Sequence, residues 1–530
     1  MKRILATTIC GAALACVGML SSCSDALTED PKGKLAPTSY FSTEEELNMS
    51  VYALYSKVML TQISTNAQLP QWMGDDITTD PVSNKQAAVE FDSFIPSDNN
   101  KGLTACWDSY YVVIKAANYI INNADRTPVS EAKRNVAIGQ AKYWRAYSYF
   151  TLVRIFGAIP VNLTNEIDYQ KVPSSVAEVY DLIVKDLQEA EATLPASYSK
   201  APEKFNGTNT YITQQAAKAT LAAVYMARAG WPLNETTYYS QAAAKAKEVI
   251  DGVKAGKYEY QLESEFKNVY ASSRNYNLET VVGINYQAAF RWSQDSQLTS
   301  SSLFASVGGW GDAWGEIRFW KDMPEGPRKD VIYAPKIRLK NGTLVDWWAK
   351  DATGKNLVPE NHPMMTIFTL GNGEVDYDYT KAPSTRRTDS HRHRSIRYAE
   401  VLLWYAEAQA RADGSPNAMA YDCVNQIRKR AGLEALPSGM SGKDFADAVA
   451  QEHGWEVAGY WCALVTRRDD LMRLGKLRKV YERRLANEPI EVAPGVFVKE
   501  AVELPQRPWD DSFVYAPYPG TDTSLNNNLK

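Results

Sequence analysis

The segment from Tyr143 to Phe156 reads YWRAYSYFTLVRIF and gives the strongest indication of the fold. It is apolar nearly all round, and a helix of this kind is buried between neighbouring elements. Gly157 follows directly, and Pro160 prevents the helix from resuming. The sequence therefore predicts a central helix that ends at Phe156 and is covered by other helices.

Helical patterns recur on both sides of this stretch. Ser42 to Glu46 offers a capping box ahead of an apolar stripe of helical spacing that includes Leu47, Leu54 and Tyr55. Further helices are expected near residues 107–121, 175–194, 213–229, 238–250, 397–412, 416–431, 445–449 and 467–485. Paired helices with short connections predict a mainly α fold, a helical-hairpin scaffold formed by residues 38–284 and 397–486.

Two segments depart from this helical pattern. Residues 285–396 contain scattered Gly and Pro with short possible strands. Such a long irregular insertion is usually functional, so we expect the ligand region there. The tail, residues 487–530, carries prolines at 489, 494, 505, 508, 517 and 519 and is expected to wrap the surface as extended chain.

The N-terminus has the pattern of a secretory leader. Met1-Lys2-Arg3 precedes a mainly apolar run from Ile4 to Leu20. The run ends in Leu20-Ser21-Ser22-Cys23, which resembles the bacterial lipobox, where the cysteine is acylated. We therefore predict a lipoprotein signal peptide at residues 1–22, lipidation of Cys23 and a polar linker at residues 23–37. The alternative is an ordinary secretory peptide with an incidental cysteine.

Composition narrows the classes of partner. The chain has 58 Lys and Arg against 62 Asp and Glu, so no cation excess exists to neutralise phosphates and nucleic acid is disfavoured as the main partner. Only 4 histidines are present, whereas Trp, Tyr and Phe number 14, 31 and 14. This composition favours binding through flat apolar faces over chemistry with imidazoles.

The sequence lacks the common motifs for catalysis and cofactor binding. The sequence contains no GxGxxG, GxxxxGK[ST], HExxH or GxSxG, so no cofactor, metal or catalytic residue is predicted. His391-Arg392-His393 lies among further arginines that would repel a metal cation, and a basic loop is expected there. The segment from Asn372 to Asp378 alternates oxygen-bearing residues, and a calcium site there is kept as a minor alternative.

Several segments together resemble the SusD/RagB family of outer-membrane nutrient-binding lipoproteins. The segment from Trp144 to Pro160 is similar to that family's RAYxYFxLVxxFGxIP motif. The segment from Arg397 to Ala408 is similar to a second family segment, which continues from Val424 to Leu433. The DLMRLG sequence at residues 470–475 resembles the DLxRxG motif near the family's C-terminus. With the lipobox, the resemblance runs through most of the chain.

This resemblance implies a fold, a location and a partner. It implies a tetratricopeptide-like helical scaffold with loop-built binding surface, in a single domain over residues 38–530. It also implies a cell-surface protein, anchored in the outer membrane by lipid, that captures a nutrient and caps a TonB-dependent SusC-like transporter. Arg145, Glu400 and Glu407 lie in the family segments and are expected to form pairs within the scaffold.

A cluster of tryptophans marks the candidate ligand site. Six of the 14 tryptophans lie between Tyr286 and Ile396, about twice the density of a uniform spread. Indole faces with a few polar groups at their edges suit sugars, which present apolar C–H faces ringed by hydroxyls. We predict ligand contacts at Trp292, Trp310, Trp314, Trp320, Asp312 and Arg318. The alternative is that these tryptophans anchor loops onto the scaffold.

A secondary candidate follows the first helix of the scaffold. There Trp72 is followed by the adjacent carboxylates Asp75 and Asp76, and all three are predicted as ligand contacts. A helix cap or a solvated turn is the alternative for the two aspartates.

Three functions are compatible with these features. The first is a non-catalytic surface lipoprotein that binds oligosaccharide or polysaccharide and delivers it to the transporter. The second is a peptide-binding uptake lipoprotein on the same scaffold. The third is a surface glycoside hydrolase, which would need two carboxylates across a cleft, an arrangement that adjacent aspartates rarely supply.

Overall fold

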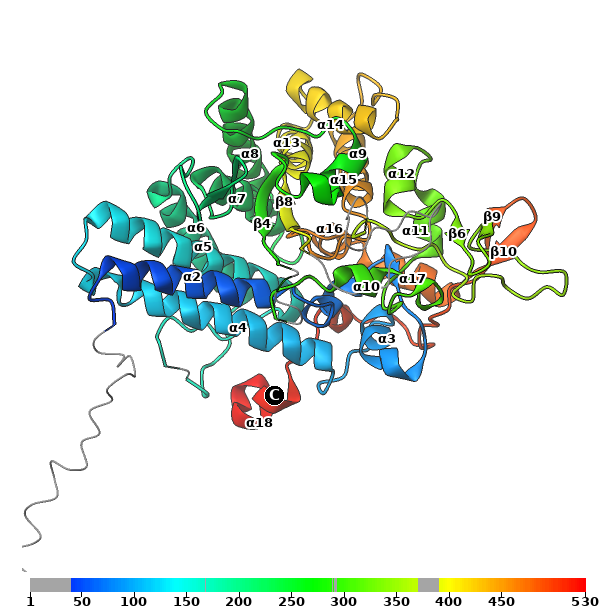
Figure 1. Cartoon of the computed structure of the whole chain (residues 1–530), viewed down its shortest axis with the longest axis horizontal. Coiled ribbons are helices and arrows are strands. Elements are labelled where there is room, and N and C mark those ends of the chain that lie inside the picture. The colour runs from blue at the N-terminus through cyan, green and yellow to red at the C-terminus, as the bar shows by residue number, and fades with distance from the viewer. Residues whose placement is uncertain (1–39, 167, 288, 290–292, 370–389) are drawn as a thin grey trace, which may run out of the picture.

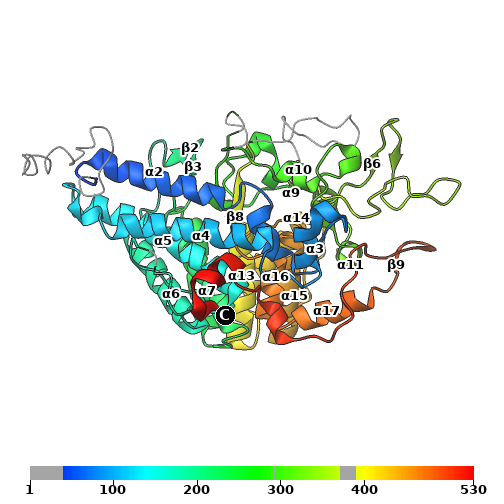
Figure 2. The ribbon, with the colours of Figure 1, turned by 90° about the horizontal axis from the view of Figure 1, so that it is seen from below.

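The scaffold is built from helices that pack in chain order (Figures 1 and 2). The computed structural model describes residues 40–530 except 167, 288, 290–292 and 370–389. α2 (Glu44–Leu60) and α4 (Lys101–Ile121) pack together, and α5 (Glu131–Phe156) packs against both α4 and α6 (Val176–Thr193). The expected capping box forms at the start of α2, where Thr43 and Glu46 accept each other's backbone N–H.

α5 contains the stretch that was predicted to be central. Every residue from Tyr143 to Phe156 is buried, and Gly157, with φ at 74°, ends the helix. The helix begins earlier than predicted, at a cap formed by Ser130. Its first turns are partly exposed, and their polar residues hide the helical pattern from the sequence.

The second half of the scaffold continues the hairpin pattern. α7 (Gln214–Ala229) packs between α6 and α8 (Tyr238–Lys254), and α13 (Tyr398–Asp413) packs on α8. α14 (Ala418–Arg430) and α15 (Gly442–Glu456) then cover α13. The mainly α, tetratricopeptide-like hairpin architecture is therefore confirmed. The predicted helix at 467–485 is wrong in one respect, because Gly475, with φ at 63°, separates α16 (Arg467–Arg473) from α17 (Leu477–Ala486).

A short buried ladder joins the two halves of the scaffold. β4 (Thr280–Ile284) pairs antiparallel with β8 (His393–Arg397), and all residues of both strands are buried. The predicted basic loop at His391-Arg392-His393 is wrong, because these three side chains are buried beside and within β8. The strands are far apart in the sequence, so their pairing left no local signal.

The segment from 285 to 396 and the tail form a second, smaller apolar core. The segment holds α10 (Leu298–Ser302), α11 (Ile317–Asp322), α12 (Pro327–Ile332), β5 (Trp314–Gly315), β6 (Ile337–Arg338) and β7 (Leu344–Val345). Trp314 and Trp347 pack there with Val492 and Val498 of the hairpin β9 (Ile490–Ala493) and β10 (Val496–Val498). The tail is therefore not only extended chain, and it ends near α18 (Gly520–Leu525).

Smaller elements complete the chain. β1 (Ile77–Thr78) pairs with β5, and α3 (Gln86–Asp92) precedes α4. β2 (Lys204–Phe205) and β3 (Thr208–Asn209) form a hairpin ahead of α7, and α9 (Phe266–Tyr270) precedes β4.

Buried ion pairs hold the helices together, as expected for the family segments. Both oxygens of Asp186 accept from Arg145, at 2.7 and 2.8 Å. Glu407 accepts from Arg473 and Arg411, and the carboxylate of Glu400 accepts the backbone N–H of Arg397. The prediction that Arg145, Glu400 and Glu407 form pairs within the scaffold is confirmed.

The predicted leader, Cys23 and linker lie outside the described residues, as does the segment considered for calcium. Among the helices that the structure does describe, none is both long and apolar enough to cross a membrane. Cys106, Cys423 and Cys462 are buried and unpaired.

Candidate functional site

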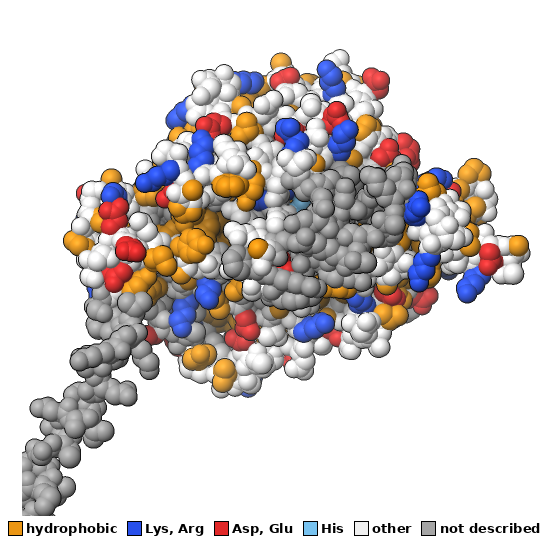
Figure 3. All heavy atoms as spheres, viewed as in Figure 1, with side chains coloured by type: hydrophobic (Ala, Val, Ile, Leu, Met, Phe, Trp, Pro, Cys, Tyr) orange, Lys and Arg blue, Asp and Glu red, His pale blue; other side chains and the backbone are white. Residues whose placement is uncertain are grey.

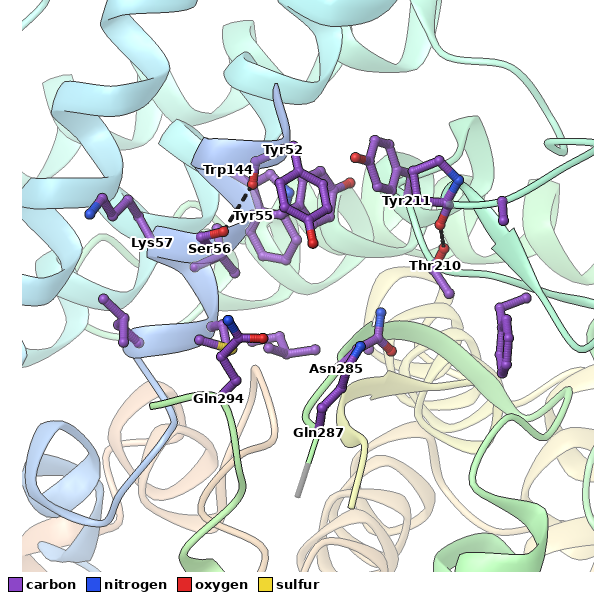
Figure 4. A pocket seen from close by; sticks show the side chains of 18 of the residues that line it. Tyr52, Tyr55, Ser56, Lys57, Trp144, Thr210, Tyr211, Asn285, Gln287 and Gln294 are labelled. Atoms are coloured by element: carbon purple, nitrogen blue, oxygen red, sulfur yellow. Dashed lines mark hydrogen bonds between the residues drawn. The ribbon is translucent and has the colours of Figure 1, made fainter. Parts of the chain in front are cut away.

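A cavity of about 560 Å³ lies between α2, the β2–β3 hairpin and β4 (Figure 4). We call it the tyrosine cavity, because tyrosines dominate the aromatic residues that line it: Tyr52, Tyr55, Tyr211, Tyr276, Phe205 and Trp144. Tyr52 and Phe205 are 54% and 48% exposed. Figure 3 shows hydrophobic side chains gathered on the face of the molecule that carries α2. The cavity thus offers aromatic surface to a ligand from solvent.

The aromatic wall of the tyrosine cavity is fixed by the scaffold. The rings of Tyr55 and Tyr211 stack with centroids 4.2 Å apart and an angle of 14° between their planes. Trp144, from the buried part of α5, packs edge-on against Tyr55 with ring centroids 5.6 Å apart. The hydroxyl of Tyr55 donates to Gln140 Oε1 and accepts the N–H of Ile212. Because both hydrogen-bonding roles are filled, the ring is held in one orientation before any ligand arrives.

The opposite wall carries amides. Asn285, Gln287 and Gln294 lie across the cavity from the tyrosines (Figure 4). The Oδ1 atom of Asn285 is buried and finds no hydrogen-bond partner in the described part of the chain. A buried acceptor without a partner is unfavourable, and a ligand hydroxyl would satisfy it. The cavity therefore combines flat apolar faces with a few polar groups, the combination that suits a sugar.

Two further hollows are lined in part by residues of α2 and α4 or of the connection between them. A hollow of about 320 Å³ shares Lys57 and Leu60 with the tyrosine cavity. A third hollow of about 250 Å³, the Trp310 hollow, shares Ser64 and Asn66 with the second. Each hollow therefore borders the next through shared lining residues.

The Trp310 hollow brings together two of the residues predicted from the sequence. Trp310 and Asp312 both line it, beside Lys85, Asn66 and Asn84. Lys85 forms an ion pair with Asp312 and donates to the carbonyl of Trp310 at 3.0 Å. Asp312 thus positions Lys85 against the tryptophan.

Comparisons with known proteins give the same family for both halves of the chain. The family model described as "Starch-binding associating with outer membrane" matches residues 27–226, and the model described as "SusD family" matches residues 291–530. The chain belongs to the SusD/RagB family. SusD-like protein P2 of Formosa agariphila is 29% identical to it, over 96% of each chain.

Solved structures share the fold of this SusD/RagB protein. Surface glycan-binding protein A from Bacteroides uniformis aligns with a TM-score of 0.70 at 20% identity, over 92% of this chain and 98% of its own. A structure solved with a xylogluco-oligosaccharide aligns with a TM-score of 0.69 at 19% identity, over 91% and 98%. At this level of identity the similarity concerns the fold alone.

The remaining tryptophans of the predicted site have structural contacts in this SusD/RagB protein. Trp314 is buried in the smaller core, 5.9 Å from Phe304 and 5.0 Å from His362, so it does not share a surface with Trp310. Trp320 is half-buried against Trp347 and Trp348, with the Lys329 ammonium over its ring at 4.4 Å. Arg318 is half-buried on α11, and Trp292 lies outside the described residues. The interpretation of Trp314 as a ligand contact is corrected: its ring is buried in the smaller core, beside Phe304 and His362.

The secondary candidate also lies in the interior. Trp72 is fully buried and packs edge-on against Trp461 at 5.7 Å. Asp75 is held by Arg467, at 2.8 and 3.2 Å; burial alone would raise the pKa of Asp75, but Arg467 and Arg483 outweigh burial and lower it. Burial raises the pKa of Asp76 to about 7, and this carboxylate accepts the N–H of Gly459. The structure places all three away from the hollows, and neither aspartate lies in a solvated turn.

The tyrosine cavity itself was missed by the sequence analysis. Tyr55 was interpreted as part of a core stripe, which its contact with Trp144 confirms in part. Tyr211 and Asn285 lie in connections without any periodic pattern. Only the packing of α2, the hairpin and β4 brings these side chains together.

Mutation can distinguish the half-buried Trp310 from the buried Trp314 by the stability that each variant loses. We expect Trp310→Ala to lower the free energy of unfolding by about 1 kcal/mol, because the ring is half-buried. Trp314→Ala removes a buried ring and should cost about 3 kcal/mol. Denaturant unfolding of both variants measures the difference, and equal losses would contradict these placements.

Proposed function

We propose that this protein is a non-catalytic, cell-surface lipoprotein that captures oligosaccharide or polysaccharide. The observation that carries the proposal is the tyrosine cavity, whose stacked aromatic wall faces amides in a member of the SusD/RagB family. Relatives by fold are described as surface glycan-binding protein and as solved with a xylogluco-oligosaccharide. We propose the Trp310 hollow as a second contact for a longer chain, with Trp310, Asp312 and Lys85 at its wall.

The proposal includes an anchor and a partner. The lipobox-like sequence before Cys23 supports attachment to the outer membrane through acyl chains, and two or more chains anchor a protein stably. The family description, with its association to the outer membrane, supports the same location. In this arrangement the bound glycan passes to a TonB-dependent SusC-like transporter, and the protein needs no chemistry of its own.

One experiment tests both binding and the absence of catalysis. The purified protein is screened on a glycan array, and each glycan that binds is then incubated with it and analysed for cleavage products. We expect binding of at least one oligosaccharide without cleavage. Cleavage would support the hydrolase alternative, and binding of peptides without any glycan would support the peptide-uptake alternative.

A further inference from the structure

Two buried arginines, Arg392 and Arg394, differ from the others because they form no ion pair with a described carboxylate. Among the described residues, every other buried arginine forms an ion pair with Asp or Glu, as Arg145 does with Asp186 and Arg484 does with Asp92. Arg392 and Arg394 are as deeply buried, and neither is within ion-pair distance of a carboxylate in that part of the chain. Burying a cation without a counter-charge is costly, so this arrangement requires an explanation.

Arg392 has the fewer partners of the two. Its Nη2 donates to the carbonyl of Asn209 at 3.0 Å, while Nε and Nη1 are buried without a hydrogen-bond partner in the described chain. Arg394, by contrast, donates to the carbonyls of Arg392 and Asn275 and to His391. Burial lowers the pKa of Arg392 to about 10, so the guanidinium still carries its charge at neutral pH.

The Arg392 guanidinium lies against residues that line the tyrosine cavity. It is 5.3 Å from the ring centroid of Tyr276, and its acceptor Asn209 precedes Thr210, another lining residue. A Cβ atom on Gly283 would come within 2.3 Å of Arg392 Nε, so only glycine permits this approach. Gly283 therefore contacts the guanidinium and lines the cavity at the same time.

The charged residue that lines the tyrosine cavity is positive, as Arg392 is. Lys57 is the one charged residue among the described lining residues, and no Asp or Glu belongs to them, although the chain contains 62. At the hairpin, Glu203 adds to the effect of burial in raising the pKa of Tyr198 and Tyr211, but it is absent from the groups that shift the pKa of Arg392. A bound anion would therefore meet one cation, Lys57, among the described lining residues, with the Arg392 guanidinium buried behind Gly283 and no carboxylate in the described wall.

We infer that the tyrosine cavity binds a sugar that carries an anionic group, a carboxylate or a sulfate ester, with Arg392 as its buried counter-charge. The inference rests on the proposed glycan-binding function and narrows its ligand class to acidic glycans. The aromatic wall contacts the sugar ring, while the positive charges of Lys57 and of Arg392, which lies behind Gly283, attract the charged oxygens. A buried cation attracts an opposite charge more strongly than it would in water, because its surroundings have a low dielectric constant.

Two matched pairs of probes test this inference. Tetragalacturonate is compared with its fully methyl-esterified form, and a sulfated galactan oligosaccharide with its desulfated form, by calorimetry on the whole protein. We expect the charged member of at least one pair to bind about tenfold tighter or more than its neutral partner. The pair that shows the difference identifies carboxylate or sulfate as the group recognised.

Variants test whether Arg392 is responsible for the preference for charged glycans. Arg392→Gln should remove the preference while neutral binding persists, Arg392→Lys should keep part of it, and Lys57→Gln at the rim should reduce it only slightly. Neutral members that bind wild-type protein as tightly as charged ones would overturn this inference and leave glycan binding intact. Failure of all oligosaccharides to bind would overturn both. If Arg392→Gln does not fold, the comparison of probes on wild-type protein still decides.

Discussion

Replacing Glu456 by alanine is expected to lower the free energy of unfolding by about 3–5 kcal/mol. Glu456 is buried at the end of α15, where its Oε1 accepts from Arg397 at 2.7 Å and Arg430 at 2.5 Å. Its Oε2 accepts from Arg328 at 3.1 Å. These arginines come from β8, α14 and α12, so one carboxylate joins three elements. Alanine leaves three buried guanidinium groups with less negative charge around them.

The pH dependence of stability offers a second way to measure how much Glu456 stabilises the fold. Burial alone would raise its pKa, but Arg430, Arg397 and Arg328 outweigh burial and lower the pKa from 4.5 to about 2. A group with a lowered pKa contributes its stability above the unfolded pKa and loses it as the pH falls through the folded pKa. The wild-type advantage over Glu456→Gln should therefore be complete at neutral pH and decline between pH 4.5 and about 2.

An exposed glutamate provides the control for Glu456→Ala. Glu482 forms an i, i+4 pair with Arg478 on α17, where both side chains are more than half exposed. Glu482→Ala should change the free energy of unfolding by less than about 0.5 kcal/mol. Similar losses for the two variants in denaturant unfolding would show that the buried network does not stabilise the scaffold.

The scaffold could be predicted from the sequence because its signals are local. The stripe of Leu47, Leu54 and Tyr55, the apolar stretch from Tyr143 and the stop at Gly157 each act within a few turns of one helix. The helix break at Gly475 was missed, because an isolated glycine inside a helical pattern does not reveal its positive φ.

The candidate site could be predicted only in part, because its contacts join distant segments. Trp310 and Asp312 were expected to lie together and do so, since they are neighbours in the chain. Trp314 is buried in a core that also contains residues of the tail hairpin, about 180 residues later, which no local pattern could indicate. Arg392 was expected in a basic loop because the pairing of β8 with β4 is not visible in either strand alone.

The side chains of the tyrosine cavity that most directly test the proposed function are Tyr52 and Tyr211. Tyr52 extends from α2 and is largely exposed, whereas Tyr211 is held by its stack on Tyr55 (Figure 4). Aromatic side chains that dominate a binding surface typically contribute more than 1 kcal/mol each when truncated. We therefore expect the Tyr52→Ala and Tyr211→Ala double variant to bind its glycan about tenfold more weakly or worse.

Thermal unfolding distinguishes a loss of glycan binding from damage to the fold. Tyr52 and Tyr169 are both 54% exposed, but Tyr169 lies on the connection between α5 and α6 and does not line the cavity. Tyr52→Ala and Tyr169→Ala should therefore have similarly small effects on thermal unfolding, while only Tyr52→Ala weakens glycan binding in calorimetry. Because the two residues are matched in type and exposure, equal affinities for the two variants would place the glycan elsewhere. If the glycan binds in the tyrosine cavity, its affinity should fall for Tyr52→Ala but not for Tyr169→Ala, while the melting temperatures of the two variants remain similar.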